Sequence, residues 1–487
     1  MSLTGSGDPN FNASNTRFSG GPITGLTVKE LQVAWKLPLS AKSQYGGYSS
    51  SPIIADGVVY SQDLDSNVQA IDLKTGKVLW TKDFQSPDQG PNGLVVAAGR
   101  VFGATATSAF ALDEKTGEEV WSVTLIKNSH EGIDMAPGYH DGIVYVSTVP
   151  GNNQLFYGGE GDGILWALDG ASGRKLWSFN TAPTGQWSPE HTSINSGGGL
   201  WYTPAFDEQG GMYIGTGNPA PFPGTEQFPW GSSRPGPDLY TDSLVKLNAA
   251  SGKLQWYYQL TPHDLYDHDL QDPPILVNVG GRQVVLEAGK SGIVIAIDAQ
   301  TGKLIWRRPV GKHNGHDNDG LYAMRQQYSR LKTPETVFPG LLGGVIAPMA
   351  SNGSTVFVPV VNLPVKYVSQ TQSSEGGEGT GGELVALDVK TGAVKWTHQF
   401  QAPAFGAATV VNDVVLTTSS NGTLYGFDAS EGSVLWEVQL PAGSNTGVAV
   451  SDDTVIVPAG LADTAGQTPE LIAYRLPSSK SASSETG

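Results

Sequence analysis

Two carboxylates placed two residues apart are the feature of this sequence with the clearest chemical potential. In TPHDLYDHD (261–269), Asp267 and Asp269 flank His268. On an extended segment, residues i and i+2 point the same way, so both carboxylates can face one ion while His268 faces away. Hard divalent or trivalent cations prefer oxygen ligands. Glu160 and the amide oxygen of Asn218 could supply two more, which predicts a metal site.

Each of these side chains also has an ordinary structural interpretation. Asn218 follows a Gly-Thr-Gly strand end, where asparagine commonly forms turns. Glu160 stands in a glycine-rich loop and could be merely solvated, and the aspartates of 261–269 could cap a turn. The eight histidines show no pairing typical of a metal site. Order and joint spacing, and not any single residue, favour the functional interpretation.

The composition predicts many short strands joined by tight turns. The 487 residues include 63 glycines and 31 prolines, and only 15% are charged. No long segment has apolar residues every three or four positions, as an amphipathic helix would. The chain has no cysteine, which excludes disulfides, thiolate metal sites, a cysteine nucleophile and the Cys-x-x-Cys-His attachment of haem.

Charge and hydropathy exclude two classes of partner. The formal net charge is -17 and the basic residues are scattered, so we expect no nucleic acid binding. No apolar run approaches the roughly 20 residues of a membrane-spanning helix. The opening Met-Ser-Leu-Thr-Gly-Ser-Gly lacks the charged and then apolar organisation of a signal peptide. A chain that begins at a mature N-terminus, after removal of its signal peptide, would also lack it.

A repeat organises nearly the whole chain. Seven segments share one pattern, in which an apolar strand ends in Asp or Asn, a turn carries Gly, and Trp follows eight residues after the Asp or Asn. The side-chain oxygen can accept backbone N–H groups of the turn, Gly can take the positive φ, and Trp can wedge between neighbouring sheets. The seven tryptophans are Trp80, Trp121, Trp177, Trp256, Trp306, Trp396 and Trp436.

An eighth unit is divided between the two ends of the chain. LQVAWKLPL (31–39) supplies Trp35 without a preceding turn, and ELIAYRLP (470–477) supplies a strand without a following Trp. With about four strands per unit, the sequence predicts an all-β, eight-bladed β-propeller with tryptophan-docking repeats, in which N- and C-terminal strands share one blade. We expect an N-terminal extension (1–27), one propeller (28–477) and a disordered tail (478–487).

Two intervals between tryptophans are long and predict insertions. Trp177 and Trp256 are 79 residues apart, and Trp306 and Trp396 are 90 apart. Insertions are where a repeat scaffold usually carries its function. The candidate metal ligands Asn218, Asp267 and Asp269 fall in or beside the first of them.

The repeat together with several local motifs resembles the quinoprotein alcohol dehydrogenases, over essentially the whole chain. This family binds pyrroloquinoline quinone (PQQ) and a metal ion on the propeller axis. LWYTPAFD (200–207), GTGNPAP (215–221) and TPHDLYDHD (261–269) carry the resemblance most clearly. FYGGEGDG (156–163) and EAGKSGIVIAID (287–298) add looser matches.

The resemblance implies a role for each matching residue. Trp201 would lie beneath the quinone, and Asn362 would lie near its rim. Glu160, Asn218, Asp267 and Asp269 would hold Ca²⁺ or a lanthanide ion. Asp267 would be the catalytic base that takes the alcohol proton. Lys290 would bridge the quinone oxygens and stabilise the growing negative charge. Taken alone, Trp201 could equally be a core residue and Lys290 a surface lysine.

Some family features are missing, and all of them concern residues that bind the quinone. The vicinal cysteine pair cannot exist here. Ser49 in GYSSSP (47–52) stands where the family has a glutamate, and Asn92 in PNGLVV (91–96) stands where it has an arginine that binds a quinone carboxylate. Because PQQ carries three carboxylates, loss of a bidentate arginine weakens binding.

Two functions therefore stay open. The first is PQQ- and metal-dependent oxidation of an alcohol or polyol, with an external electron acceptor because no haem motif is present. The second is a PQQ-free propeller that acts as a binding or scaffold module. Trp201, Asn218 and the Asp267/Asp269 pair favour the first, whereas Ser49, Asn92 and the missing cysteines favour the second. The family resemblance implies a periplasmic or secreted location.

Overall fold

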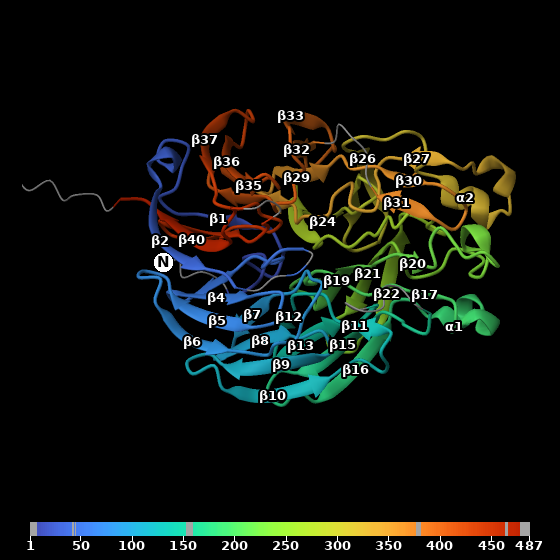
Figure 1. The fold of residues 1–487 in the computed structure, drawn as a ribbon, viewed down its shortest axis with the longest axis horizontal. Helices are drawn as coiled ribbons and strands as arrows, with labels where there is room; N and C mark the ends of the chain where they lie inside the picture. The colour runs from blue at the N-terminus through green and yellow to red at the C-terminus, as the bar shows by residue number, and fades with distance from the viewer. Residues whose placement is uncertain are drawn as a thin grey trace, which may run out of the picture.

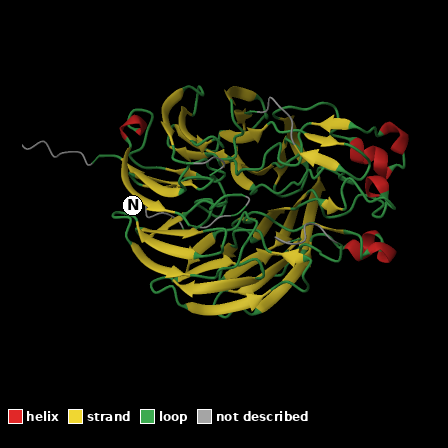
Figure 2. Ribbon diagram, viewed as in Figure 1, coloured by secondary structure: helices red, strands yellow, loops and turns green. Residues whose placement is uncertain are grey.

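Short antiparallel sheets arranged around a central axis make up the protein (Figure 1). The computed structural model describes residues 7–40, 43, 45–151, 159–375, 381–462 and 466–477. The tail predicted for 478–487 lies outside these described residues. Almost all regular structure is strand, as Figure 2 shows. In the described part of the chain, no helix has both the length and the apolar character to cross a membrane.

The first four blades follow one another along the chain, each with its first strand innermost and its tryptophan strand outermost. Their strands are β3–β6 (Ile53–Ala55, Val58–Gln62, Val68–Asp72, Val78–Lys82), β7–β10 (Leu94–Ala97, Arg100–Ala104, Ser108–Asp113, Glu119–Thr124), β12, β13, β15 and β16 (Gly138–His140, Ile143–Ser147, Ile164–Asp169, Lys175–Asn180), and β18, β19, β21 and β22 (Ala205–Phe206, Gly211–Gly215, Ser243–Asn248, Leu254–Gln259).

The other four blades complete the ring and confirm the prediction of eight. Their strands are β23–β26 (Ile275–Val279, Arg282–Glu287, Ile293–Asp298, Leu304–Pro309), β28, β29, β32 and β33 (Ala350–Ser351, Thr355–Val361, Gly382–Asp388, Val394–Phe400), β34–β37 (Thr409–Val411, Val414–Thr418, Thr423–Asp428, Val434–Gln439), and β38–β40 with β2 (Ala449–Ser451, Thr454–Ala459, Glu470–Arg475, Gln32–Pro38).

The split blade closes as the sequence predicted. β2, near the start of the chain, pairs antiparallel with β40, near its end, and Trp35 lies opposite Ala473. The N-terminal and C-terminal strands therefore share one sheet, which leaves the ring without a free seam between its first and last blades.

The repeated tryptophans join each blade to the next. A Cβ added to the turn glycine of one blade would come within 3.0 Å of the tryptophan ring of the preceding blade, at seven successive interfaces. At six of these interfaces the indole N–H also donates to a backbone carbonyl of the neighbouring blade; Trp256, for example, bonds to Ala299. The aspartate of the repeat accepts N–H groups of its turn, as Asp298 does from Thr301.

Replacing one of these glycines is expected to destabilise the ring. Gly302 has φ +69° and faces the Trp256 ring, so alanine there adds both backbone strain and a clash. We expect Gly302→Ala to lower the free energy of unfolding by about 2–3 kcal/mol, measured by urea denaturation. Gly280→Ala is the control, because Gly280 has φ +60° with nothing within 4 Å of the added Cβ. Equal losses in both variants would contradict tryptophan docking.

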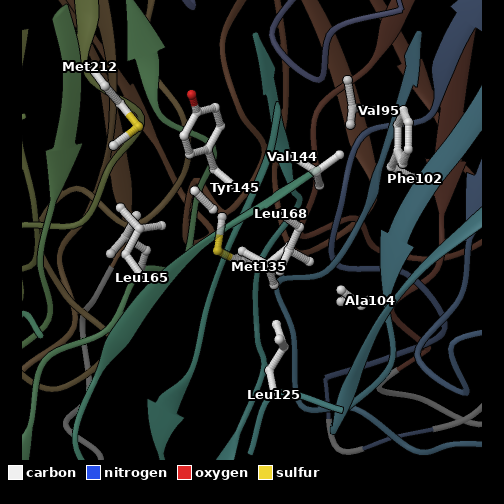
Figure 3. Packing of buried hydrophobic residues seen from close by; sticks show 14 of the residues in the cluster. Val95, Phe102, Ala104, Leu125, Met135, Val144, Tyr145, Leu165, Leu168 and Met212 are labelled. Atoms are coloured by element: carbon white, nitrogen blue, oxygen red, sulfur yellow. The ribbon is translucent and has the colours of Figure 1, made fainter. Parts of the chain in front are cut away.

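Apolar side chains fill the spaces between blades. In the cluster of Figure 3, Val95 and Phe102 from the second blade, Tyr145 and Leu165 from the third, and Met212 from the fourth lie together and are buried. Burial of apolar surface supplies the main driving force for holding such sheets together. The scaffold around the axis is thus a set of packed apolar interfaces.

Residues 7–19, which we call the N-terminal strap, cross the inner strands of several blades. Backbone N–H groups of five inner strands donate to strap carbonyls, and the last strap residues form β1 (Phe18–Ser19), which runs parallel to β34. The donor–acceptor pairs are Val96–Gly7, Phe206–Ala13, Leu276–Ser14, Ser351–Thr16 and Val410–Arg17. The strap therefore ties together blades that are distant in the sequence.

Both predicted insertions are present and lie together at one side of the ring (Figure 1). The first holds α1 (Thr184–Trp187), two 3-10 helices, η2 (Pro189–His191) and η3 (Pro229–Gly231), and the strand pair β17 (Ser196–Gly197) and β20 (Pro219–Ala220). The second holds α2 (Asp319–Met324), η4 (Tyr328–Arg330) and the small sheet β27, β30 and β31 (Glu335–Val337, Val365–Tyr367, Ser373–Glu375). Together they surround the aspartate motif.

Candidate functional site

Asp264 shapes the loop that carries the two candidate carboxylates. One oxygen of Asp264 accepts the backbone N–H of Tyr266 at 3.1 Å, and the other accepts that of His268 at 2.8 Å. Asp267 itself has φ +63°. The segment is therefore a tight turn at Asp267, and its prediction as an extended segment is wrong. Asp264 forms the turn cap that the structural interpretation of this motif allowed.

Lys290 lies at the centre of the candidate site. Its ammonium is 2.8 Å from Oδ2 of Asp267 and 2.7 Å from Oδ2 of Asp269, and it lies 4.3 Å from the ring centroid of Trp201. The lysine and both carboxylates are buried, whereas Trp201 is half-buried. The turn thus brings both carboxylates to one cation, and four of the predicted residues meet in space.

Asn218 joins this group through Asp269. The backbone N–H of Asn218 donates to Oδ1 of Asp269 at 2.6 Å, and its side-chain NH₂ donates to the Pro219 carbonyl. Within the described residues, the Oδ1 atoms of Asn218 and Asp267 are buried without a hydrogen-bond partner. Unpaired buried oxygens are costly unless a ligand satisfies them, and a hard cation is a suitable ligand.

Electrostatics at the pair reflect burial and the shared lysine. Burial raises the pKa of Asp267 well above its usual range; Lys290 opposes that rise and Asp269 adds to it. Burial likewise raises the pKa of Asp269. Burial lowers the pKa of Lys290, but the two carboxylates outweigh it, so that pKa is raised. The lysine is therefore charged, and the carboxylates bind protons more readily than exposed aspartates do.

Two of the sequence candidates stand apart from this group. The Glu160 side chain is exposed, and its backbone bonds to Thr192 and Asn128. Asn362 is buried, but its amide accepts from the Lys312 backbone and donates to Glu383. In the described part of the chain, no three His, Cys, Asp or Glu side chains are grouped to hold a metal. A cation here would bind Asn218 with Asp267 and Asp269.

A buried arginine that the sequence analysis did not find supports the loop. Arg234 pairs with Asp238, and its NH₂ group donates to the Asp264 carbonyl at 2.6 Å. Neither Arg234 nor Asp238 has any exposed side-chain surface. No spacing rule pointed to them, because they lie in an insertion outside the repeat. Together they fix the Asp264 turn and so the position of Asp267.

An aromatic cap covers the same loop. Tyr266 packs against Tyr367 with ring centroids 4.8 Å apart, and both belong to an apolar cluster with Trp230 and Leu265. The Tyr266 hydroxyl donates to Asp319 at 2.7 Å. The Tyr367 hydroxyl, also buried, has no partner in the described structure, and burial raises its pKa further than Asp264 and Asp267 do. The cap shields the site from water.

His316 makes the cap sensitive to pH. Its Nδ1 lies 2.8 Å from the Asp319 carboxylate, and this hydrogen bond raises the pKa of His316. A raised pKa stabilises the fold below the ordinary histidine pKa and loses that contribution as pH rises through the folded value. We expect His316→Gln to cost about 1 kcal/mol of unfolding free energy near pH 6 and almost nothing near pH 9.

Urea denaturation at the two pH values measures this difference. His191→Gln is the control, because its ring packs on Phe228. A His316→Gln loss that is the same at both pH values would show that the ring acts through packing and not through charge.

A small axial pocket of about 30 Å³ lies beside Tyr202, the neighbour of Trp201. Ser49, Asn92 and Arg17 line it. Arg17 is buried, and its guanidinium donates hydrogen bonds to the side chains of Asn10 and Thr409 and to the carbonyls of Ala408 and Val448. This side of the site therefore offers fewer free cationic groups than a quinone with three carboxylates would need.

A buried acid pair lies in the neighbouring inner loops of the second and third blades. Asp88 and Asp134 are both buried, and their carboxyl groups interact with each other. Burial raises the pKa of Asp88 to about 6 and that of Asp134 well above its usual range.

The residues of the whole candidate site fit a metal ion and the flat face of a quinone. They do not provide cationic groups that would bind the carboxylates of the quinone.

Comparison with known families gives two overlapping matches. The family described as "Glucose/ethanol/alcohol dehydrogenase, beta-propeller domain", a PQQ family, matches residues 9–99 and 136–335. The family described as "Outer membrane protein assembly factor BamB" matches residues 64–202 and 339–476. The first match includes all five residues of the candidate site, namely Trp201, Asn218, Asp267, Asp269 and Lys290.

Curated relatives are quinone-dependent alcohol dehydrogenases. The quinohemoprotein alcohol dehydrogenase of Comamonas testosteroni is 29% identical over 85% of this chain and 66% of its own length. The quinoprotein alcohol dehydrogenase PedH of Pseudomonas putida is 28% identical over 82% of this chain and 76% of its own. The chain spans 66%, 52% and 50% of the length of three of these curated relatives.

Solved structures confirm the fold. The quinohemoprotein alcohol dehydrogenase ADHIIG of Pseudomonas putida HK5 has a TM-score of 0.83 at 22% identity, covering 96% of this chain and 79% of that one. A europium-containing methanol dehydrogenase has a TM-score of 0.78 at 20% identity, covering 96% and 97%. With the family match and the aspartate, lysine and tryptophan cluster in place, the chain belongs to the PQQ-dependent alcohol dehydrogenase family of β-propellers.

Proposed function

We propose that the protein oxidises an alcohol or polyol to the aldehyde or ketone, with PQQ, a Ca²⁺ or lanthanide ion, and an external electron acceptor. The observation that carries the proposal is the meeting of Asp267 and Asp269 at Lys290, whose ammonium lies over the Trp201 ring. Asn218 bonds to Asp269, and its amide oxygen is buried with no partner among the described residues. The proposal includes a periplasmic or secreted location, as the family resemblance implies.

Different side chains would bind the cation, support the quinone and accept the substrate proton. Asn218, Asp267 and Asp269 would hold the cation, and Trp201 would support the quinone ring. Bound there, the quinone and its metal would supply the electron acceptor that protein side chains lack. Asp267 accepts the proton of the substrate hydroxyl, and its raised pKa makes it a stronger base than an exposed aspartate.

The surroundings would assist the proton transfer. The Lys290 ammonium, which lies 2.8 Å from Asp267 in this structure, would compensate negative charge in the site. The aromatic cap of Trp230, Tyr266 and Tyr367 keeps bulk water away, which strengthens these charge interactions.

A second candidate function has its own support. Ser49 and Asn92, the Asp88/Asp134 acid pair and the BamB family match all favour a propeller that binds no PQQ and acts as a binding or scaffold module. In that case the buried lysine and aspartates would form a permanent ion cluster.

Titration of the purified protein with PQQ separates the two. With Ca²⁺ or La³⁺ present, we expect a change in the quinone absorbance on binding, and then reduction of an artificial dye when simple alcohols are added. Absence of PQQ binding with both metals would contradict the enzyme and support the scaffold. Binding without dye reduction by any alcohol would contradict the proposed reaction alone.

A further inference from the structure

The geometry points to Lys290 as a built-in cation that occupies the Asp267/Asp269 pair until a metal ion displaces it. This inference rests on the proposed function, because it concerns loading of the same site. The ammonium is within hydrogen-bonding distance of Oδ2 on both carboxylates, at 2.8 and 2.7 Å. It therefore neutralises the two groups that a metal would need most.

The ammonium and a metal ion would compete for the same two carboxylates. A Ca²⁺ ion binds carboxylate oxygens at about 2.3–2.6 Å, so an ion on these oxygens would lie within about 5 Å of the ammonium. Two cations at that distance in a buried site repel strongly. Metal binding must consequently move the ammonium away from at least one carboxylate.

Other oxygens of the site are ready for the incoming ion. The Oδ1 atoms of Asn218 and Asp267 are buried and unpaired in the described structure, and the lysine does not satisfy them. A metal would satisfy these oxygens as well as the carboxylates, whereas the ammonium reaches only the carboxylates. This difference in satisfied ligands would drive the exchange.

The Trp201 ring offers an alternative contact for the displaced ammonium of Lys290. Before a quinone binds, this ammonium lies 4.3 Å from the centroid of the Trp201 ring, which can hold a cation by cation–π attraction. The flexible four-carbon stem lets the head group move while the backbone stays bonded to Asp269. Loading would therefore release the lysine from at least one carboxylate of the pair.

Removing the competing ammonium is expected to tighten metal binding. Tb³⁺ alone, followed by tryptophan-sensitised luminescence, serves as the probe and requires no PQQ. We expect Lys290→Met to bind Tb³⁺ on the order of tenfold more tightly than the wild type at neutral pH, because the repulsion between the two cations is gone. Equal or weaker binding by Lys290→Met overturns the inference.

Lys246→Met is the matched control. Lys246 also pairs with a buried carboxylate, Asp207, at 3.0 Å, and also lies over an aromatic ring, that of Tyr213, at 4.7 Å. It lies outside the candidate metal site, so we expect its replacement to leave the Tb³⁺ affinity unchanged. An equal gain in Lys246→Met would mean that any lysine loss raises the affinity, and would also overturn the inference.

A crystal structure of the wild type with Tb³⁺ tests the exchange without a variant, should Lys290→Met fail to fold. We expect the ion on Asp267, Asp269 and Asn218, with the ammonium beyond hydrogen-bonding distance of at least one carboxylate. An ion with both Lys290 contacts intact, or no ion at all, overturns the exchange. PQQ-dependent dye reduction is scored separately, so the enzyme proposal can stand when this inference fails.

Discussion

Asp267→Asn is expected to reduce quinone-dependent alcohol oxidation by a factor of about 10²–10⁴, the usual contribution of a positioned general base. Asparagine keeps the shape of the side chain but cannot accept the proton of the substrate hydroxyl. The substitution would remove the basic carboxylate at position 267, while the hydrogen bonds that Asp264 accepts from the turn would remain. Dye reduction at saturating PQQ and metal measures the loss.

Asp113→Asn provides the control for this variant. Asp113 caps the repeat turn of the second blade by accepting backbone N–H groups of Lys115 and Thr116, at the exposed edge of the ring. The same change of chemistry there is expected to leave activity unaltered. If Asp267→Asn retained wild-type oxidation with PQQ bound, the assignment of the base would be wrong.

Arg234→Ala is expected to have the largest effect on stability. It would leave Asp238 buried without its charge partner and remove the hydrogen bond to the Asp264 carbonyl. Breaking a buried ion pair from one side costs about 3–5 kcal/mol, because the remaining charge stays in a medium that solvates it poorly. The free energy of unfolding, from urea denaturation, measures the cost.

Arg282→Ala separates this effect from the loss of any arginine. Arg282 pairs with Asp298, but 53% of its side chain is exposed, so its removal is expected to cost less than about 1 kcal/mol. Similar losses in both variants would show that Arg234 contributes as a surface arginine does. A stable Arg234→Ala protein with wild-type activity would remove Arg234 from the support of the site.

The fold could be predicted because its signal is repeated. An Asp turn, a glycine and a tryptophan recur at fixed spacing, and each supplies one local need: the cap, the positive φ and the interblade wedge. Trp35 could be assigned to a shared blade because the same wedge was missing beside β40. The N-terminal strap carried no such signal, since its bonds are made by backbone groups and one arginine.

The site was harder to predict, because contact depends on turns and insertions. The two carboxylates were expected to share a side through an extended backbone, but a left-handed Asp267 in an Asp264-capped turn brings them to Lys290 instead. Asn218 and Trp201 were predicted as site residues because the motifs that contain them resemble those of the family. The exposure of Glu160, the Arg234 support and the Asp88/Asp134 pair depend on tertiary packing, which spacing in one sequence does not record.

The N-terminal strap has a consequence for the order of folding. Arg17 bonds to Ala408 and Val448, which lie 391 and 431 residues further along the chain, while Asn15 in the same strap bonds to the Thr203 carbonyl, two residues after Trp201. Single blades can form from neighbouring hairpins, but contacts at such separations are slow to find. The N-terminal strap is thus fully bonded only when the last blades dock, so a ligand that reaches the nascent chain meets a site whose neighbouring strap is not yet fixed.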